Sequence, residues 1–375
     1  MKTGDNWFMR AISIEQVLCA AAQFDLGGII VGCNIYGSGH INGTNLITVQ
    51  TPQGSTKRYI LQTINGDVFP NPEQVIENIA KVTEFLHKKG LSGRRVLNII
   101  PTRDGHLRYW DTSGLCFRMY DFIESSVCLD KAESPEVFYQ SGFAFGEFQR
   151  YLTDFPVDEL HETLADFHNT PKRFEDFLSA VEQDRFGRVS MVQKEIDFVH
   201  KRMAFCSVLV NAHAQGRLPL RVTHNDTKLN NVMLDEKSRK ALCVIDLDTV
   251  MPGFSVNDFG DAIRFGANTA AEDERDLSKV SLDMELFEAY TKGFLKGCDG
   301  ILGNEEIRLL PEGAKMMTLE CGMRFLTDYL QGDTYFKTAY EGHNLDRCRA
   351  QFRLVECMEE HWRDMKNCVE KYIQK

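Results

Sequence analysis

The chain has 375 residues, 43% hydrophobic and 26% charged, which is the composition of a folded globular protein long enough for two lobes. Its formal net charge is −11 and no Lys/Arg run exceeds two residues, so nucleic acid is not an expected partner. No segment approaches the roughly 20 apolar residues needed to span a bilayer, so we expect no membrane insertion.

The cysteines and the start of the chain indicate a compartment. Eleven cysteines are scattered without a Cys-x-x-Cys pair, as expected of reduced thiols. Residues Asp5 and Glu15 stand near the start, without a long apolar run and basic flank, so we expect no secretory signal. We therefore predict a cytoplasmic protein, and we expect a monomer.

The first part of the chain has the pattern of a sheet with few helices. Helical spacing at 13–26 precedes strand patterns at 28–36 and 46–49, which flank a glycine-rich turn at 37–44. Backbone amides in such a turn can approach phosphates, although an ordinary hairpin has the same composition. A helix entered through Pro72 is predicted at 71–89, and further strands at 58–64, 96–100, 107–111 and 115–123.

From residue 136 onward the spacing of apolar residues is mainly helical. The predicted helices span 136–151, 157–168, 174–182, 190–215, 282–297, 312–331 and 344–373, and only a hairpin at 222–248 interrupts them. We therefore predict an α+β fold with two lobes. A β-rich lobe at 1–123 is followed by a mainly helical lobe at 124–375.

The hairpin contains the most informative polar residues. Asp226 lies five residues before Asn231, and Asp246 stands where the second strand-like run stops. Phosphoryl transfer from a nucleotide needs a carboxylate near the acceptor hydroxyl and hard oxygen ligands for magnesium. Asn and Asp are also common turn residues, so each of them alone would indicate only a turn. Their joint spacing indicates a phosphotransfer site.

These residues carry a resemblance to a known group of enzymes. His224-Asn225-Asp226-Thr227-Lys228-Leu229-Asn230-Asn231 and Ile245-Asp246-Leu247-Asp248 resemble the aminoglycoside phosphotransferase and choline kinase superfamily, which implies a bilobal, protein-kinase-like fold. Within it, the chain is most similar to N-acetylhexosamine 1-kinases. The features of that similarity are Gly39-His40-Ile41-Asn42, Tyr59-Ile60-Leu61-Gln62, Phe167-His168-Asn169-Thr170-Pro171 and Arg324-Phe325-Leu326-Thr327-Asp328-Tyr329-Leu330.

The resemblance implies a reaction and its cofactors. ATP and Mg²⁺ would serve an enzyme that phosphorylates the anomeric hydroxyl of N-acetylglucosamine or N-acetylgalactosamine. Asp226 corresponds to the catalytic base, and Asn231 and Asp246 correspond to the magnesium ligands. His224 is expected to orient the loop. Asp258 and Asp261 are expected to brace the lobe and the start of its helix, although Asp258-Phe259-Gly260 repeats a protein-kinase triplet.

The resemblance also implies binding positions. The nucleotide is expected at Gly37, Gly39, Gln62 and the main chain of Asp121 and Ile123 in an interlobe hinge. Backbone recognition at the hinge does not distinguish ATP from GTP. His40, Asp226 and Arg324 are expected to contact the sugar, since an Arg fork supplies several donors to hydroxyl and acetamido groups.

Several assignments have alternatives. Lys228 either approaches the transferred phosphate or is a solvated surface charge. Asp248 either contacts the metal or the substrate or is a turn residue. The alternative for Arg324 is a buried cation paired with Asp328. Gln62 stands where kinases normally carry a phosphate-anchoring lysine, and a neutral amide cannot replace that charge, so Arg58 is a candidate.

Two other functions compete with the sugar kinase. The first is another small-molecule kinase of the superfamily, acting on an amino sugar, an aminoglycoside or a choline-like alcohol. The second is a nucleotide- or sugar-binding pseudokinase, suggested by Gln62. The retention of Asp226, Asn231 and Asp246 argues against the pseudokinase.

Overall fold

The computed structural model describes residues 12–37 and 41–373. The chain forms two compact units, residues 1–124 and 125–375. The first is built on a β-sheet and the second mainly on helices, which confirms the predicted α+β class.

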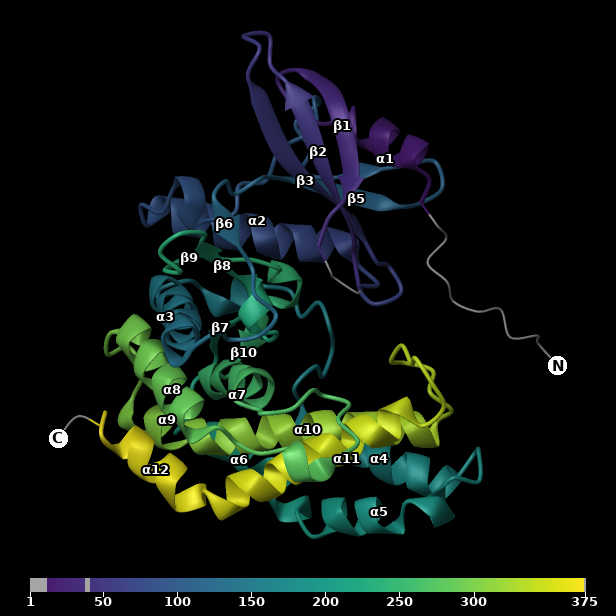
Figure 1. Ribbon diagram of the computed structural model, residues 1–375, viewed down its shortest axis with the longest axis vertical. Coiled ribbons are helices and arrows are strands. Elements are labelled where there is room, and N and C mark those ends of the chain that lie inside the picture. Colours follow the sequence, from purple (N-terminus) through teal and green to yellow (C-terminus); the bar gives the residue numbers. More distant parts are fainter. Residues whose placement is uncertain (1–11, 38–40, 374–375) are drawn as a thin grey trace. The chain divides into compact units, whose positions relative to one another are not determined.

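Unit 1 contains a five-stranded antiparallel sheet with the order β1-β2-β3-β5-β4 (Figure 1). The strands are β1 Ile29–Ile35, β2 Gly43–Gln50, β3 Thr56–Ile64, β4 Tyr109–Trp110 and β5 Cys116–Asp121. Successive side chains of a strand point to opposite faces. Leu61 of β3 and Met119 of β5 are register partners on the face that packs against Phe24 and helix α1 (Ile14–Ala21). Residues such as Gln62 therefore belong to the other face.

Local signals in the sequence explain where the two helices of unit 1 begin. Ser13 and Gln16 form a reciprocal capping box at the start of α1. Helix α2, Pro72–Lys88, begins after Asn71, whose side chain accepts from the N–H of Gln74, and Pro72 occupies the first turn. The capping residues thus define both starts within a residue of the prediction.

Two of the predicted strands in unit 1 are wrong or shortened. Residues 96–100 form no strand, and only an isolated bridge joins Ile99 to Tyr120. The run at 107–111 contributes just the two residues of β4. Hydrogen bonds between Ile100 N–H and Met119 O (2.9 Å) and between Asp121 N–H and Asn98 O (3.0 Å) tie the first segment to β5 without a regular ladder.

Unit 2 consists of helices with short strands between them. Its helices are α3 Pro135–Tyr151, α4 Thr170–Gln183, α5 Gln193–His200, α6 Val208–Ala214, α7 Ser255–Gly266, α8 Met284–Cys298, α9 Asn304–Arg308, α10 Leu310–Leu330, α11 His343–Glu360 and α12 Trp362–Glu370. Its strands are β6 Ser126–Val127, β7 Arg221–Thr223, β8 Val232–Asp235, β9 Ala241–Val244 and β10 Met251–Gly253, paired as β6-β8-β9 and β10-β7.

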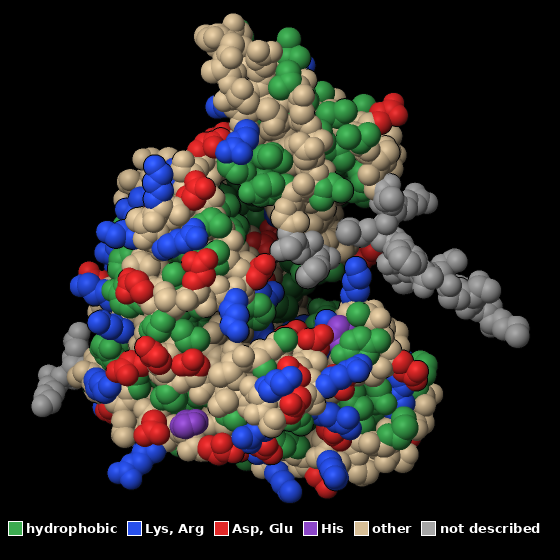
Figure 2. All heavy atoms as spheres, in the orientation of Figure 1, with side chains coloured by type: hydrophobic (Ala, Val, Ile, Leu, Met, Phe, Trp, Pro, Cys, Tyr) green, Lys and Arg blue, Asp and Glu red, His purple; other side chains and the backbone are tan. Residues whose placement is uncertain are grey.

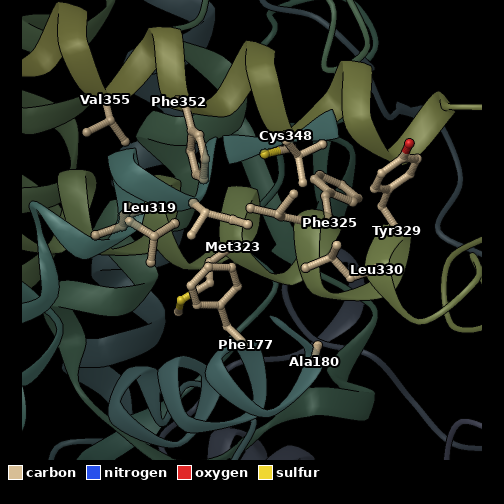
Figure 3. Packing of buried hydrophobic residues seen from close by; sticks show 14 of the residues in the cluster. Phe177, Ala180, Leu319, Met323, Phe325, Tyr329, Leu330, Cys348, Phe352 and Val355 are labelled. Atoms are coloured by element: carbon tan, nitrogen blue, oxygen red, sulfur yellow. The ribbon is translucent and has the colours of Figure 1, made fainter. Parts of the chain in front are cut away.

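Helix α10 runs through unit 2 and packs against α4, α7 and α11. Figure 3 shows Leu319 and Met323 of α10 packed between Phe177 of α4 and Phe352 of α11. Burial of such side chains stabilises a core by about 1.5–3 kcal/mol each.

The side chains outside this core are mixed in charge. On the face that Figure 2 shows, Lys and Arg side chains of unit 2 are interspersed with Asp and Glu.

Glycines allow some helices of unit 2 to touch along their backbones. A Cβ on Gly260 of α7 would lie 2.2 Å from the main-chain oxygen of Gly313 on α10, and one on Gly313 would lie 2.0 Å from Val256 O. Both distances are far below an ordinary carbon-to-oxygen contact. Helix α7 can therefore approach α10 only because neither residue has a side chain.

Three predicted helices of unit 2 differ from the structure. Residues 157–168 form only a short 3-10 turn, Val157–Glu159, because Thr163 Oγ1 instead donates to Asp248 O (3.2 Å). The helix predicted at 190–215 is interrupted after α5, where Arg202 binds both carboxylate oxygens of Glu359. The helix predicted at 344–373 breaks at His361 into α11 and α12. The short strands β6, β7 and β10 also accompany the predicted hairpin.

The helices and cysteines of the described residues share two general properties. No helix in the described parts of the chain combines the length and apolar character that crossing a bilayer requires. All eleven cysteines lie within the described residues, and each is a free thiol.

Candidate active site

Asp226 and Asn231 of the predicted phosphotransfer motif lie on one loop of unit 2. β7 ends at Thr223, and the loop passes through Asp226 to a single 3-10 turn, Leu229–Asn231, after which β8 begins. Asn225 has a left-handed backbone with φ of 64°, a conformation that asparagine tolerates better than most residues. The loop doubles back and brings Asn231 against Asp226.

Asp226 is held by two neighbours. Asn231 donates from Nδ2 to the main-chain oxygen of Asp226 (2.8 Å) and to its Oδ2 (3.2 Å). Lys228 Nζ lies 2.7 Å from Oδ1 of the same carboxylate. The side chain of Asp226 remains 24% exposed. Both of its carboxylate oxygens are thus oriented while the group stays accessible to a small molecule.

Lys228 forms an ion pair and is not a solvated loop charge. Burial acts to lower its pKa, but the negative charges of Asp226 and Asp261 outweigh burial and raise the pKa of Lys228. The ammonium group therefore keeps its charge at neutral pH. It places a fixed positive charge beside the carboxylate of Asp226.

His224 lies beneath the loop and is fully buried. Its Nε2 lies 2.8 Å from the main-chain oxygen of Ile245, and its Nδ1 accepts from the N–H of Asp226 at 3.3 Å. The two ring nitrogens thus face the main chain of two different segments. Both ring nitrogens are used to orient the loop, which is the role predicted for His224.

Asp258 supports the loop from α7. Its carboxylate accepts from the main-chain N–H groups of His224 (2.9 Å) and Asn225 (2.7 Å) and from Gln149 Nε2 (2.7 Å). Burial raises the pKa of Asp258, while His224 and these donors act in the opposite direction. Asp258 was predicted to brace the lobe and the start of its helix, and these contacts show that it holds the main chain of the loop.

Asp261 supports the loop one turn further along α7. Its Oδ2 accepts from the main-chain N–H of Thr227 (3.0 Å), and its Oδ1 binds Arg264 Nε and Nη2 (3.0 and 2.8 Å). Burial acts to raise the pKa of Asp261, but the charges of Arg264 and Lys228 outweigh it and lower the pKa. Asp261 therefore braces the loop as an ionised carboxylate, a role in addition to the predicted support of its own helix.

Asp246 follows β9 and is exposed. It adopts a left-handed backbone with φ of 59° and ψ of 57°. The preceding Ile245 donates its N–H to Asn231 O (2.9 Å) and accepts from His224, so Asp246 is tied to the loop that carries Asn231. Asp248 is buried, only 3% exposed. Of these two carboxylates, Asp246 is the accessible one.

Asn231 and Asp246 supply the oxygen donors that Mg²⁺ prefers. Because Nδ2 of Asn231 faces Asp226, its Oδ1 is the end of the amide left to face a cation. In the described ranges, no three His, Cys, Asp or Glu side chains are grouped so that they could hold a metal by themselves. A metal ion at Asn231 and Asp246 would thus need further oxygens from its ligand, as a nucleotide phosphate would provide.

Arg324 lies on α10 and is half-buried among aromatic rings. Its guanidinium carbon is 5.5, 5.7 and 5.4 Å from the ring centres of Phe167, Tyr335 and Phe336. The predicted alternative, an ion pair with Asp328, is wrong. Asp328 accepts instead from Asn344 and from the main-chain N–H groups of residues 334–336. Among the described residues, Arg324 donates to Tyr335 Oη (3.4 Å) and forms no ion pair.

A second arginine lies near Arg324. Arg173 of α4 donates from Nη2 to Phe167 O at 3.2 Å, and its Nε is buried without a hydrogen bond in the described part of the chain. Burial and then the charge of Arg324 lower the pKa of Arg173. Two cations, Arg173 and Arg324, thus lie near each other, and the carboxylate of Glu320 interacts with both.

His168 and Glu320 form a connection that the sequence analysis missed. His168 Nδ1 lies 2.9 Å from Glu320 Oε1 on α10, and its Nε2 lies 3.1 Å from the main-chain oxygen of Asn225. Burial acts against ionising both groups, but their mutual interaction outweighs it, raising the pKa of His168 and lowering that of Glu320. The helix that carries Arg324 is thus linked to the loop that carries Asp226.

The predicted nucleotide-binding residues belong to unit 1. Gln62 lies on β3, Asp121 ends β5, and Ile123 follows β5 and is buried. Gly37 follows β1 with φ of 79°, a conformation that favours glycine. The predictions for Gly39 and His40 fall on residues 38–40, which lie outside the described residues.

The candidate cation Arg58 is engaged elsewhere in unit 1. It binds Glu124, with Nε 2.9 Å from Oε1, and its guanidinium lies over the ring of Phe122.

A different arginine contacts Gln62. Arg118 of β5 donates to Gln62 Oε1 from Nε and Nη2, at 3.1 and 2.8 Å. Sequence analysis did not identify Arg118.

Solved structures with the same fold include several phosphotransferases. An aminoglycoside phosphotransferase from Alicyclobacillus acidocaldarius has a TM-score of 0.63 at 12% identity, with 94% of this chain and 96% of that one covered. The microcompartment-associated aminopropanol kinase has a TM-score of 0.62 at 14% identity, with 94% and 99% covered. An amicoumacin kinase in complex with AMP-PNP and Ca²⁺ has a TM-score of 0.60 at 13% identity, with 91% and 93% covered. At this identity the similarity establishes the fold, which is the predicted protein-kinase-like one.

The sequence itself establishes the family. A model of the phosphotransferase enzyme family matches residues 36–290. The match includes Gln62 of unit 1 and the whole segment from His224 to Asp246 of unit 2. The chain therefore belongs to the phosphotransferase enzyme family, within the superfamily of aminoglycoside phosphotransferases and choline kinases.

Proposed function

We propose that this protein is an ATP- and Mg²⁺-dependent small-molecule kinase that phosphorylates the anomeric hydroxyl of N-acetylhexosamines. The observation that carries the proposal is the arrangement around Asp226. An accessible carboxylate is fixed by Asn231 and Lys228, and the exposed carboxylate of Asp246 belongs to a segment hydrogen-bonded to the same loop. Phosphoryl transfer depends mostly on such positioning and on charge neutralisation.

Asp226 acts as the catalytic base in this proposal. Its carboxylate would accept a hydrogen bond from the acceptor hydroxyl, hold that oxygen in line with the phosphate, and take its proton. The contacts from Asn231 and Lys228 limit the directions in which the carboxylate can turn. Lys228 also supplies a positive charge close to the position where the transferred phosphate would arrive.

Asn231 Oδ1 and the Asp246 carboxylate would hold magnesium. When bound there, the ion would neutralise charge on the nucleotide phosphates. Gly37 and Gly39 would present backbone amides to those phosphates, together with Gln62. The main chain of Asp121 and Ile123 would pair with the adenine base.

Arg324 and His40 are the proposed sugar contacts. The guanidinium of Arg324 has no carboxylate partner among the described residues, so its donors can serve hydroxyl and acetamido oxygens. Arg173 adds a second positive charge nearby. Two cations disfavour a polycationic acceptor by like-charge repulsion. This argues for a neutral sugar over an aminoglycoside or a choline-like alcohol.

The two alternative functions, another small-molecule kinase and a pseudokinase, differ in the acceptor they use and in whether phosphate is transferred. Another small-molecule kinase of the superfamily would use the same loop with a different acceptor. A pseudokinase would bind nucleotide without transfer, but the accessible Asp226 beside Asn231 favours a working enzyme. The free state of all eleven cysteines fits the proposed cytoplasmic location, and we propose that the enzyme acts as a monomer.

An acceptor panel tests the proposal. The protein is incubated with MgATP and N-acetylglucosamine, N-acetylgalactosamine, kanamycin or choline, and release of ADP is measured. Release that depends on an N-acetyl sugar supports the proposal, whereas release only with a cationic acceptor replaces it with the alternative kinase.

Variants of arginine then test the acceptor contact. Arg324→Lys should raise the KM for the sugar and leave the KM for ATP unchanged, because an ammonium cannot reproduce the fork of donors. Arg353→Lys is the matched control, since Arg353 forms ion pairs with Glu356 and Glu360 on α11. An unchanged sugar KM in Arg324→Lys would remove Arg324 from the site.

A further inference from the structure

A row of three polar side chains crosses the middle of the sheet in unit 1. Thr44 of β2 is the register partner of Gln62 of β3, and Gln62 is the register partner of Arg118 of β5. The neighbouring Leu61 and Met119 point to the opposite face, into the apolar core with α1. The row therefore lies on the face of the sheet that α1 does not cover.

Hydrogen bonds fix the orientation of the Gln62 amide. Arg118 grips Oε1 with two donors, at 3.1 and 2.8 Å, and Gln62 Nε2 donates to Thr44 Oγ1 at 3.2 Å. Rotating the amide by 180° would place an NH₂ group against a guanidinium, where donor meets donor. The NH₂ end of Gln62 is thus held on the side away from Arg118, with a second N–H still to donate.

Arg118 is an unusual residue for this position. Its side chain is only 1% exposed and it is the largest fully buried side chain of the described residues. Burying a charge is costly unless the charge is well hydrogen-bonded, and apolar residues of similar volume usually fill such a site at lower cost. A buried cation directly behind Gln62 therefore calls for a role in addition to packing.

We propose that Arg118 and Gln62 together replace the lysine that anchors nucleotide phosphates in related kinases. Arg118 is a positioning residue that does not touch the nucleotide. It orients the amide and polarises it, so that the NH₂ of Gln62 donates a stronger hydrogen bond to a polyphosphate. The inference rests on the proposed function, because it concerns the nucleotide that the kinase would use.

This assignment resolves the problem posed by a neutral residue at position 62. A lone amide lacks the positive charge that phosphates need. In this protein the charge stands one strand away, on β5, and acts through the amide. The ligand recognised is a nucleoside di- or triphosphate, and the β- and γ-phosphates are the groups that distinguish it from a monophosphate.

The test compares the binding of ATP and AMP by calorimetry, with Mg²⁺ and without acceptor. The ratio of the two affinities reports phosphate anchoring separately from recognition of the base. The variants are Arg118→Met, Gln62→Glu and the double variant Gln62→Lys with Arg118→Met. Arg108→Met is the matched control, because Arg108 belongs to unit 1 and pairs with Glu73 on α2. Thermal unfolding is measured for every protein.

The expected result is a selective loss. Arg118→Met and Gln62→Glu should reduce the preference for ATP over AMP about tenfold or more, the scale of a charge-assisted hydrogen bond, and leave AMP affinity unchanged. Arg108→Met should keep the preference. The double variant should recover most of it, because a lysine at position 62 restores the cation directly.

Other results would overturn the inference about Arg118 and Gln62. A folded Arg118→Met or Gln62→Glu protein with the wild-type preference overturns the inference, as does a double variant no better than Arg118→Met. If Arg118→Met does not fold, Gln62→Glu still decides, since a glutamate at 62 keeps an acceptor for Arg118 but loses the donor. A wild-type protein that binds no ATP would refute the proposed function itself, which is a different outcome.

Discussion

Replacing Gly260 with alanine should weaken both the stability of unit 2 and the activity. Gly260 lies on α7 between Asp258 and Asp261, the two carboxylates that hold the candidate catalytic loop. A Cβ at this position would meet Gly313 O at 2.2 Å and Gly313 C at 2.4 Å on α10. Ordinary contacts begin near 3.4 Å, so α7 and α10 must move apart by roughly 1 Å.

Two effects oppose each other in this variant. Alanine favours helix over glycine by about 1 kcal/mol, whereas overpacking costs about 1–3 kcal/mol. The clash should win because the alanine meets backbone atoms, which cannot rotate away as a side chain could. We expect a net loss of up to about 2 kcal/mol, and Tm should fall by about 2–4 °C for each kcal/mol. A displacement of about 1 Å at the loop would lower kcat by up to about 100-fold.

Thermal unfolding and acceptor-dependent ADP release measure the two effects. Gly66→Ala is the control, because a Cβ at Gly66 meets no atom within 4 Å and its φ is not in the left-handed region. Wild-type Tm and kcat in Gly260→Ala would refute the reasoning, since the close approach of α7 to α10 would then have no consequence.

Three further predictions concern the loop and its support. Asp226→Asn should keep nucleotide affinity, measured by calorimetry, while turnover falls by about 100-fold or more, and unchanged turnover would remove Asp226 as the base. Asp258→Ala leaves the N–H groups of His224 and Asn225 without their acceptor, so the free energy of unfolding in a urea titration should fall by about 2–4 kcal/mol; a loss below 1 kcal/mol would contradict the bracing role. The pair of His168 and Glu320 should make stability depend on pH. Since the pKa of His168 is raised above 6.5, its contribution is complete below pH 6.5 and is lost as the pH rises through the raised value. Since the pKa of Glu320 is lowered from 4.5, its contribution is complete above pH 4.5 and is lost as the pH falls through the lowered value. The stability difference between wild type and Glu320→Gln should therefore be largest between pH 4.5 and 6.5, and a difference independent of pH would contradict the ion pair.

Local chemistry made part of the fold predictable. Asn71 and Pro72 mark the start of α2 because a cap and a fixed φ act within one turn. The loop from Asp226 to Asn231 was recognisable because its contacts join residues five positions apart. Contacts between residues far apart in the sequence determine the parts of the fold that were not predicted. Residues 157–168 have helical spacing, but the bond from Thr163 to Asp248 O holds them in an irregular path.

The supporting residues of the site could not be found in the same way. Arg118 meets Gln62 across 56 positions of sequence, through the register of β3 with β5. His168 meets Glu320 across 152 positions, through the packing of α10 near the loop. Neither pair has a local pattern, because strand register and helix packing place the partners together.

The most direct test of the account is phosphorus NMR of the product formed from MgATP and an N-acetylhexosamine. The wild-type protein should give a sugar phosphate whose phosphorus couples to the anomeric proton, and Asp226→Asn should give little of it in the same time. A product phosphorylated on another hydroxyl would contradict the proposed position of transfer. Equal product from Asp226→Asn would contradict the role of the loop on which the account depends.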